Sequence, residues 1–273
     1  MRKLLLFSLT AFFALGYSSA PYSQQSDWEK EQMRINKVKK VTTLIFFHPA
    51  GGSSNPTPSK FTSEFDRQGN LLKRIGYDSQ SGAPLLQFNY KYNDKNHMTE
   101  YASDNEKLTI SYKYVDGRML EATIFNTNGT VKERHNYTLN STGKVTEDAF
   151  YDGDGRFKGK REQRYDGRGN TVEYAEYDAG RKLSSRQTHT FNSKGNATET
   201  SSYGSDGRIS SRITYRYDST DRLMEKITYN GDGSIETRSS YKRDANGFVV
   251  EDSEVNAKSG AVTRTTSSYE FYQ

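Results

Sequence analysis

The sequence predicts an all-β protein built from a repeated pair of strands. The prediction rests on a 26-residue period, turn motifs at regular intervals, and alternation of apolar and polar residues between the turns. The period is carried by an acidic column, Glu121, Glu147, Glu173, Glu199, Glu225 and Glu251. A basic column lies 13 residues further along, at Arg134, Lys160, Arg186, Arg212, Arg238 and Arg264. We expect a repetitive antiparallel β-meander of about 15 strands that curls into a large open or barrel-like sheet.

Residues 1–20 predict a secretory signal peptide. Arg2 and Lys3 precede an apolar run over residues 4–16, and small residues follow it. This run is shorter than the roughly 20 apolar residues that span a bilayer, so we expect no transmembrane segment. The chain has no cysteine, which leaves it without disulfides. We therefore expect an exported protein, located in the periplasm, on the outer surface or outside the cell.

Residues 21–60 predict an N-terminal segment of different character. Ser26 and Glu29 have capping-box spacing at the start of residues 28–40, which favours a short charged helix. Residues 41–47 are β-branched and aromatic, as is typical of a first strand, and residues 48–59 have the composition of a loop. The repeat domain is then expected to occupy residues 61–273.

The repeats are expected to turn at four-residue motifs that begin with Asp or Asn and end with Gly. Residues 166–169 (Asp-Gly-Arg-Gly) and 192–195 (Asn-Ser-Lys-Gly) are two examples. The side chain at the first position can bond the backbone of its own turn, and glycine adopts positive φ without strain. These motifs predict hairpin loops built on a type I turn that is followed by a glycine bulge.

Positions counted from the turn glycine predict which side chains share a face. Position +2 is usually aliphatic, position +8 is often aromatic, and position +4 holds the glutamates in alternate strands. Because these offsets have the same parity, we expect them to point to one common, buried face of the sheet. The opposite parity is mostly Ser, Thr, Lys, Arg and Asn, and we expect it to face water.

The charge columns predict a ladder of ion pairs across neighbouring strands. If a hairpin is centred on the loop at residues 203–208, Glu199 lies opposite Arg212 on the neighbouring strand. A hairpin centred on residues 179–180 likewise places Glu173 opposite Arg186. Each pair contributes roughly 0.2–1 kcal/mol and penalises a slipped register. A charged groove for a polar polymer is the alternative, but a ligand site rarely needs the same residues on every repeat. The predicted structural ladder comprises Glu173, Arg186, Glu199, Arg212, Glu225 and Arg238.

Tyrosines near strand ends are the candidate ligand contacts, because exposed aromatic rings stack on sugar rings. Most of them occur as pairs on one face, and Tyr174 has the opposite parity. Burial in the core is the alternative role, and we favour it for most tyrosines. The candidates are Tyr90, Tyr92, Tyr112, Tyr114, Tyr174, Tyr215 and Tyr217.

The sequence contains no motif that predicts catalysis. Its four histidines lack ligand spacing for zinc, and the Asp-Gly-Asp-Gly turn at residues 152–155 departs from the calcium-loop pattern. Gly-x-Ser-x-Gly, a phosphate loop and a nucleophilic cysteine are all missing from the sequence. The net charge of +5 comes from interspersed opposite signs, which is not the footprint of a nucleic-acid partner. We expect a non-enzymatic protein without cofactor or metal.

The recurring Tyr-Asp turns at residues 151–156, 165–170 and 215–218 resemble the YD repeats of the Rhs family. The resemblance covers roughly residues 61–272. It implies a large curled antiparallel sheet in an exported or cell-surface protein, in a family where some members enclose a toxin and others are linked to carbohydrate binding. The chain lacks the family's core-end segment and a C-terminal cargo domain, so we do not expect toxin delivery. It also looks like short exported YD-repeat proteins of Gram-negative bacteria.

The expected function is therefore an exported, non-catalytic binding or scaffold protein of the bacterial envelope, which recognises carbohydrate or another envelope protein. The first alternative is a purely structural or assembly element, in which an uncapped edge strand at residues 263–272 adds to a neighbouring chain. A polysaccharide-active enzyme is the remote alternative.

Overall fold

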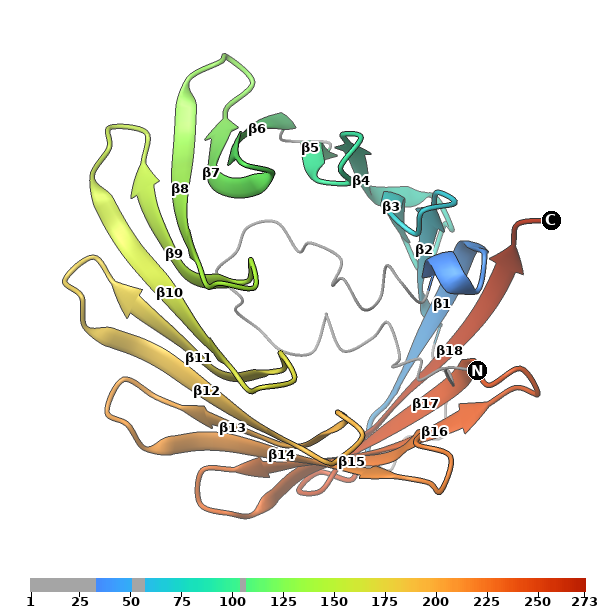
Figure 1. Cartoon of the computed structure of the whole chain (residues 1–273). Helices are drawn as coiled ribbons and strands as arrows, with labels where there is room; N and C mark the ends of the chain where they lie inside the picture. Colours follow the sequence, from blue (N-terminus) through green and yellow to red (C-terminus); the bar gives the residue numbers. More distant parts are fainter. Residues whose placement is uncertain (1–32, 51–56, 104–106) are drawn as a thin grey trace. The chain divides into compact units, whose positions relative to one another are not determined.

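A computed structural model describes residues 33–50, 57–103 and 107–273 of the chain. The predicted signal peptide at residues 1–20 lies outside them. Among the described residues, 33–35 are helical, and eighteen strands contain most of the others (Figure 1). None of the helical structure in these ranges has the length and hydrophobicity to cross a bilayer. The chain divides into two compact units, and the predicted all-β antiparallel meander is confirmed in both.

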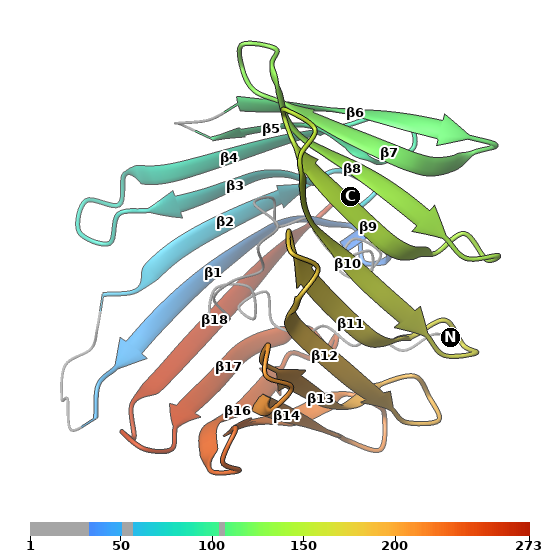
Figure 2. The ribbon, with the colours of Figure 1, turned by 90° about the vertical axis from the view of Figure 1, so that its left-hand side faces the viewer.

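The second unit contains residues 107–215 and 228–235. Strands that are consecutive in the chain pair with each other, always antiparallel (Figure 2). The strands of this meander are β6 (Lys107–Val115), β7 (Arg118–Phe125), β8 (Val131–Leu139), β9 (Val145–Asp152), β10 (Phe157–Tyr165), β11 (Thr171–Asp178), β12 (Leu183–Phe191), β13 (Ala197–Tyr203) and β14 (Ile209–Tyr217), whose last two residues belong to the first unit.

The first unit contains the described residues up to 103 together with residues 216–227 and 236–273. Its pairing order is β16-β17-β18-β1-β2-β3-β4-β5, again antiparallel throughout. Its strands are β1 (Val38–His48), β2 (Ser59–Phe65), β3 (Leu71–Tyr77), β4 (Pro84–Tyr92), β5 (Met98–Ser103), β15 (Leu223–Asn230, of which residues 223–227 belong here), β16 (Ile235–Arg243), β17 (Val249–Asn256) and β18 (Val262–Phe271).

The first and last strands of the chain are hydrogen-bonded neighbours. Strand β1 pairs with β18 from Val38 opposite Phe271 to His48 opposite Val262, and with β2 on its other side. The prediction of an uncapped edge at residues 263–272 is therefore wrong, because the N-terminal strand covers that edge. The first strand expected at residues 41–47 is confirmed and is longer. The proposed boundaries 1–20, 21–60 and 61–273 stay a prediction.

The helix expected over residues 28–40 ends earlier than predicted. Residues 33–35 are helical, but Lys37 has a φ of 53° and β1 begins at Val38. The N–H of Lys37 donates to the Arg34 carbonyl at 3.1 Å, which closes the last helical turn. The residues that follow are extended because they pair with β18 and β2. Intrinsic helix propensity is too weak to prevent this.

The hairpin loops have the predicted geometry. In the turn at residues 166–169, the N–H of Gly169 donates to the Asp166 carbonyl at 2.9 Å, and Gly169 has a φ of 82°. The Asp166 carboxylate accepts the N–H groups of Arg168 and Asn170, both at 2.9 Å. These bonds lower the pKa of Asp166, first through the Asn170 side chain and then through its backbone N–H. Type I turns closed by a glycine are thus confirmed.

The expectation of one common apolar face is wrong. Tyr137 pairs directly with Asp148, whereas Tyr151 pairs with Arg134, so the two rings point to opposite faces of the sheet. The pairing register shifts by one residue after the turn, between Thr138 and Leu139. A bulge of one residue reverses the alternation of side chains, so the same offset faces opposite sides in successive strands.

Candidate ligand-binding site

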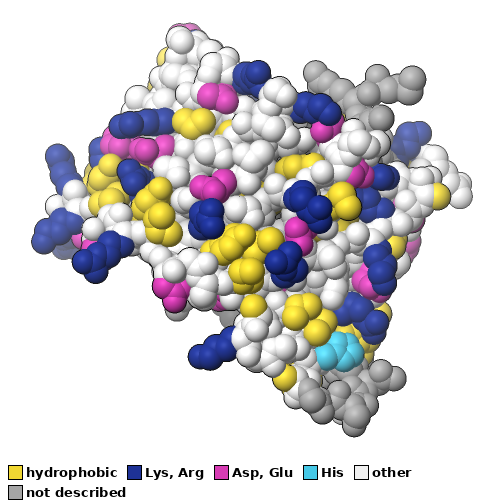
Figure 3. Space-filling view, turned by 90° about the horizontal axis from the view of Figure 1, so that it is seen from below, with side chains coloured by type: hydrophobic (Ala, Val, Ile, Leu, Met, Phe, Trp, Pro, Cys, Tyr) yellow, Lys and Arg dark blue, Asp and Glu magenta, His cyan; other side chains and the backbone are white. Residues whose placement is uncertain are grey.

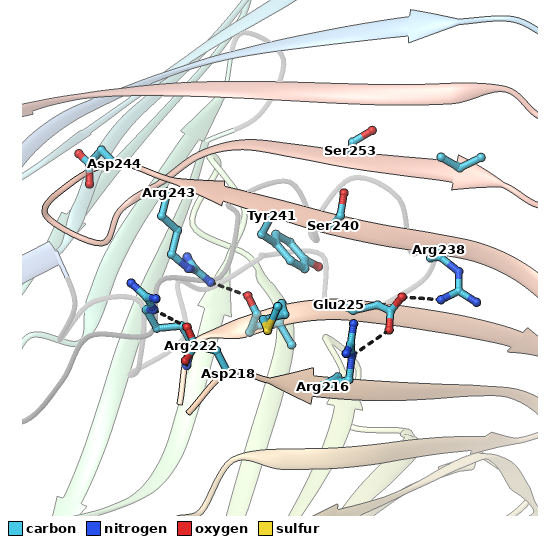
Figure 4. Close-up of a pocket in the computed structure, with 13 residues that line it drawn as sticks. Arg216, Asp218, Arg222, Glu225, Arg238, Ser240, Tyr241, Arg243, Asp244 and Ser253 are labelled. Atoms are coloured by element: carbon cyan, nitrogen blue, oxygen red, sulfur yellow. Dashed lines mark hydrogen bonds and ion pairs between the residues drawn. The ribbon is translucent and has the colours of Figure 1, made fainter. Parts of the chain in front are cut away.

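A cavity of about 640 Å³ lies in the first unit, against the end of β14 and strands β15, β16 and β17 (Figure 4). We call it the arginine pocket, after four guanidinium groups among its charged lining residues: Arg216, Arg222, Arg238, Arg243, Asp218, Glu225 and Asp244. The loops and strands that carry these residues are those of the predicted repeat. The lining residues differ from copy to copy, as Arg243 shows in a column that holds Tyr217 and Tyr269.

Glu225 joins two arginines at one end of the pocket. Its Oε2 accepts from Arg216 Nε at 3.2 Å, and its Oε1 accepts from Arg238 Nη1. The hydrogen bond from Arg238 is the main reason why the pKa of Glu225 is lowered. One carboxylate thus faces two guanidinium groups, and this end of the pocket carries an excess of positive charge.

The two aspartates of the pocket are engaged in their own turns. Asp218 Oδ1 accepts the N–H groups of Thr220 and Arg222 at 2.8 and 3.0 Å, and its Oδ2 accepts from Arg222 Nε at 2.7 Å. Burial acts to raise the pKa of Asp218, but these hydrogen bonds outweigh it and hold the pKa below its usual range. Asp244 Oδ1 accepts two backbone N–H groups of its own turn, at 3.0 and 2.8 Å.

Arg243 lies beside Arg222 at the other end of the pocket (Figure 4). Its Nη2 donates to the carbonyl of Leu223 at 2.9 Å. The pKa of Arg243 is lowered, first by burial and next by the charge of Arg222. Two like charges are therefore held near each other, and the Asp218 carboxylate, which bonds Arg222 Nε at 2.7 Å, partly offsets their repulsion.

Uncharged groups complete the lining. Tyr241, Ser240 and Ser253 provide a ring and three hydroxyl groups, and Met224 and Val255 add apolar surface that is 46% and 39% exposed. Guanidinium groups donate, carboxylates accept and hydroxyls do both. The pocket can therefore bind a ligand rich in hydroxyl groups.

A second group of charges lies in the second unit, on the sheet face opposite to Glu199 and Arg212. We call it the ionic cluster, and it consists of Glu133, His135, Asp148, Arg161 and Glu176. His135 Nδ1 lies 2.8 Å from Asp148 Oδ1, and its Nε2 lies 2.6 Å from Glu133 Oε1. Arg161 bonds Asp148 Oδ2 at 3.2 Å and Glu176 Oε1 at 3.4 Å.

The centre of the ionic cluster is buried, and its opposite charges are paired with each other. His135 and Asp148 are only 8% and 9% exposed. Burial acts to lower the pKa of His135, but the bonds to Asp148 and Glu133 outweigh it and raise the pKa to about 9. His135 is therefore protonated at neutral pH, which places two cations among three carboxylates. The arrangement stabilises this face of the sheet, where water was expected.

The tyrosines predicted as ligand contacts do not line the arginine pocket. Tyr90 is 8% exposed and packs edge-to-face on Tyr101, with 5.7 Å between ring centroids. The Tyr92 hydroxyl donates to the Leu71 carbonyl at 2.8 Å. Tyr217 is half-buried at the end of β14. Tyr90 therefore belongs to the core, and ligand contact at Tyr92 and Tyr217 stays a prediction. Tyr241, which lines the pocket, belongs to the aromatic column that was expected in the core.

The remaining candidates lie on one face of the second unit. Strand pairing places Tyr174 on the same face as Tyr112 and Tyr215, so the prediction of opposite parity for Tyr174 is wrong. Burial raises the pKa of Tyr112 and of Tyr174 to about 12 in each case. The ring centroid of Tyr114 is 6.3 Å from that of Tyr112. Ligand contact at these tyrosines stays a prediction.

The charge ladder is present, with a different register from the one predicted. Arg212 pairs directly with Ser201 and reaches Glu199 diagonally, with 3.3 Å between Nη1 and Oε2. Lys160 reaches Glu147 at 3.0 Å in the same way. Figure 3 shows basic and acidic side chains next to each other on one face of the molecule, with hydrophobic side chains between them.

One predicted rung is wrong. Arg186 pairs directly with Ala175, and Glu173 with Thr188. Within the described residues, Glu173 lies 3.8 Å from Arg164, and the Arg186 guanidinium lies over the Tyr203 ring at 4.2 Å. The observed register differs from the predicted one by two positions, one from the bulge and one from the centre of the turn, so Arg186 lies opposite Ala175 and its guanidinium packs on an aromatic ring.

No protein-family model matches the chain, and no curated protein matches it in sequence. Solved structures with some similarity include a porin-like protein from Bacteroides uniformis, at 15% identity and a TM-score of 0.47, covering 85% of this chain and 98% of that chain. A LolA superfamily protein from Nitrosomonas europaea shows 10% identity and a TM-score of 0.34, covering 90% of this chain and 91% of that one. The TcdB2–TccC3 structure shows 14% identity and a TM-score of 0.26, and the match covers 78% of this chain and 15% of that chain. The resemblance to YD repeats stays a prediction from the sequence.

Proposed function

We propose that the chain is an exported, non-catalytic binding protein of the bacterial envelope, and that its ligand is a carbohydrate bound in the arginine pocket. The proposal is carried by a cavity of about 640 Å³ whose lining includes Tyr241, two serines, four arginines and three carboxylate residues. This volume falls in the range of roughly 300–1,000 Å³ that is usual for small-molecule sites.

The chemistry of the lining favours a sugar. Sugar hydroxyls donate and accept, so they need both kinds of partner, and the pocket offers Arg216 and Arg238 beside the Glu225 carboxylate. Tyr241 supplies a ring on which the apolar face of a sugar can stack. The exposed Met224 and Val255 extend the apolar part of this surface.

Export and lack of catalysis are supported by the sequence. Residues 1–20 have the pattern of a secretory signal, and the chain carries none of the nucleophile or phosphate-loop motifs named above. Assembly through a free edge at β18 is not proposed, because β18 is paired on both sides by β17 and β1.

A glycan array probed with the exported chain tests this function, with Ser240→Trp as the variant that fills the pocket. Ser240 is exposed and lines the cavity, so an indole there should abolish binding without unfolding the sheet. Ser184→Trp is the matched control, at an exposed serine of β12. An empty array, or equal binding by the Ser240→Trp variant, would overturn the proposal. Mass spectrometry of a bound oligosaccharide after incubation should show it intact, and cleavage products would contradict a non-catalytic role.

A further inference from the structure

We infer that the arginine pocket recognises an acidic carbohydrate, whose carboxylate or sulfate group is bound by Arg222 and Arg243. This inference rests on the proposed function and specifies the ligand of the same site. Both arginines differ from the residues at the equivalent positions of the neighbouring repeats.

Arg243 stands in a column of aromatic residues. At the 26-residue spacing, its equivalents are Tyr165, Phe191, Tyr217 and Tyr269. The hydroxyl of Tyr165 donates to the Val145 carbonyl at 2.7 Å, and that of Tyr269 to the Val249 carbonyl at 2.9 Å. Arg243 makes the corresponding bond to the Leu223 carbonyl, also over a separation of 20 residues and at 2.9 Å. A tyrosine can therefore make this bond as well as Arg243 does, and Phe191 shows that a copy of the repeat can also lack it.

Arg222 differs from its counterparts in the two preceding copies, which are Asn170 and Asn196. The two copies before those hold Arg118 and Lys144. Asn170 Nδ2 donates to Asp166 Oδ2 at 2.8 Å, and Arg222 Nε donates to Asp218 Oδ2 at 2.7 Å. The turn is thus closed equally well by an amide. Each arginine stands where a neighbouring copy has a neutral residue that makes the corresponding hydrogen bond. Each therefore adds a positive charge and further N–H donors.

The added charges converge on one end of the cavity. Figure 4 shows Arg222 and Arg243 close together there, while Arg216, Glu225 and Arg238 lie at the other end. The charge of Arg222 contributes to the lowered pKa of Arg243, so the two guanidinium groups repel each other. Asp218 and Asp244 accept backbone N–H groups in their turns. A planar anion between the two arginines would offset the repulsion and accept paired hydrogen bonds.

The structure supplies a variant that removes the charges and keeps the repeat. In R222N/R243Y, each arginine is replaced by the residue of a neighbouring copy, so the hydrogen bonds to Asp218 and to the Leu223 carbonyl are retained. The matched control is R156N/R208N, which removes two charges from turn residues that are 73% and 88% exposed. The probes are the acidic oligosaccharide that binds most tightly on a mixed array and its carboxyl-reduced or desulfated form, measured by titration calorimetry.

We expect the unmodified chain to bind the acidic probe at least about 10-fold more tightly than its neutral form, since a charge-assisted hydrogen bond contributes roughly 1.5–3 kcal/mol. R222N/R243Y should lose this preference, and R156N/R208N should keep it. Carboxyl reduction and desulfation tell which acidic group is recognised. Equal affinity for both probes, or unchanged acidic binding by R222N/R243Y, would overturn the inference and leave the proposed function standing. An array without any bound glycan would remove both.

Discussion

Arg212 reaches Glu199 diagonally across β13 and β14, with 3.3 Å between Nη1 and Oε2, while its direct partner in the register is Ser201. The same guanidinium lies over the Tyr229 ring at 4.3 Å. Arg212 of β14 thus contacts a carboxylate on β13 and an aromatic ring on β15, the strands before and after it in the sequence. This geometry makes the ladder sensitive to register, since a shift of one residue would place Arg212 on the other face.

Glu199→Arg should destabilise the fold by about 1 kcal/mol, because it sets two cations against each other. The two side chains are 36% and 39% exposed, so solvent screening keeps the effect small. Adding Arg212→Glu in the same molecule should restore much of the loss. A double-mutant cycle by urea denaturation measures the coupling, and simple additivity of the two changes would contradict the ladder.

The free energy of unfolding should fall as the pH rises above neutrality because of His135. Its pKa is raised from 6.5 to about 9 in the folded state. The stabilisation is therefore complete below pH 6.5 and is lost as the pH rises through about 9. A shift of this size corresponds to about 3 kcal/mol. Urea denaturation between pH 6 and 10 should show this decline in the unmodified chain and its absence in His135→Gln.

His189 is the internal comparison for this experiment. Burial lowers its pKa, so the neutral form is favoured in the folded state. Its contribution is complete above pH 6.5 and is lost as the pH falls from 6.5 through the lower pKa of the folded state. His189→Gln should therefore keep the decline on the alkaline side. If it abolished that decline, or if His135→Gln kept it, the assignment to the ionic cluster would be wrong.

Arg161→Met should destabilise the second unit by about 3–5 kcal/mol. The change removes the guanidinium that bonds both the buried Asp148 and the partly buried Glu176. Arg156→Met is the comparison, because Arg156 is 73% exposed, and its loss should change the stability by less than about 0.5 kcal/mol. Thermal unfolding of the two variants should separate clearly, and similar melting temperatures would contradict a buried cluster.

Gly231→Ala should cost about 1–3 kcal/mol through overpacking. A Cβ at Gly231 would lie 2.5 Å from the Ile209 carbonyl oxygen, and backbone cannot move away easily. Gly167 occupies the same position of its own turn, and a Cβ there would meet nothing within 4 Å. Chemical denaturation of Gly231→Ala and Gly167→Ala should therefore give a large and a negligible loss, respectively, and the reverse order would contradict this backbone contact.

Local chemistry predicts the strands and turns of this chain well. Asp166 and Gly169 show why, since each turn is determined by its own residues and needs no distant partner. The faces were predicted wrongly because one bulge residue per hairpin reverses the alternation, as Tyr137 and Tyr151 show. The sequence does not predict the ionic cluster, because polar residues on one face of a strand are expected to be exposed to water. His135 and Asp148 are buried on that face because they are paired with each other.

The arginine pocket could have been suspected from one sequence signal. Arg243 interrupts a column that is uncharged in the three preceding copies and in the following one, and Arg222 follows two copies that hold asparagine at its position. Such departures identify residues that the repeat itself does not require. Their proximity could not be predicted, because it depends on how β15 and β16 lie against each other at the turns. The pairing of β1 with β18 was equally out of reach, since it joins residues from the two ends of the chain.

A crystal structure of the exported chain with the acidic oligosaccharide tests the central claim most directly. We predict density for the sugar in the arginine pocket, with its acidic group within hydrogen-bonding distance of Arg222 and Arg243 and a sugar ring against Tyr241. Clear density for the sugar on any other surface, with the pocket holding only solvent, would contradict the account.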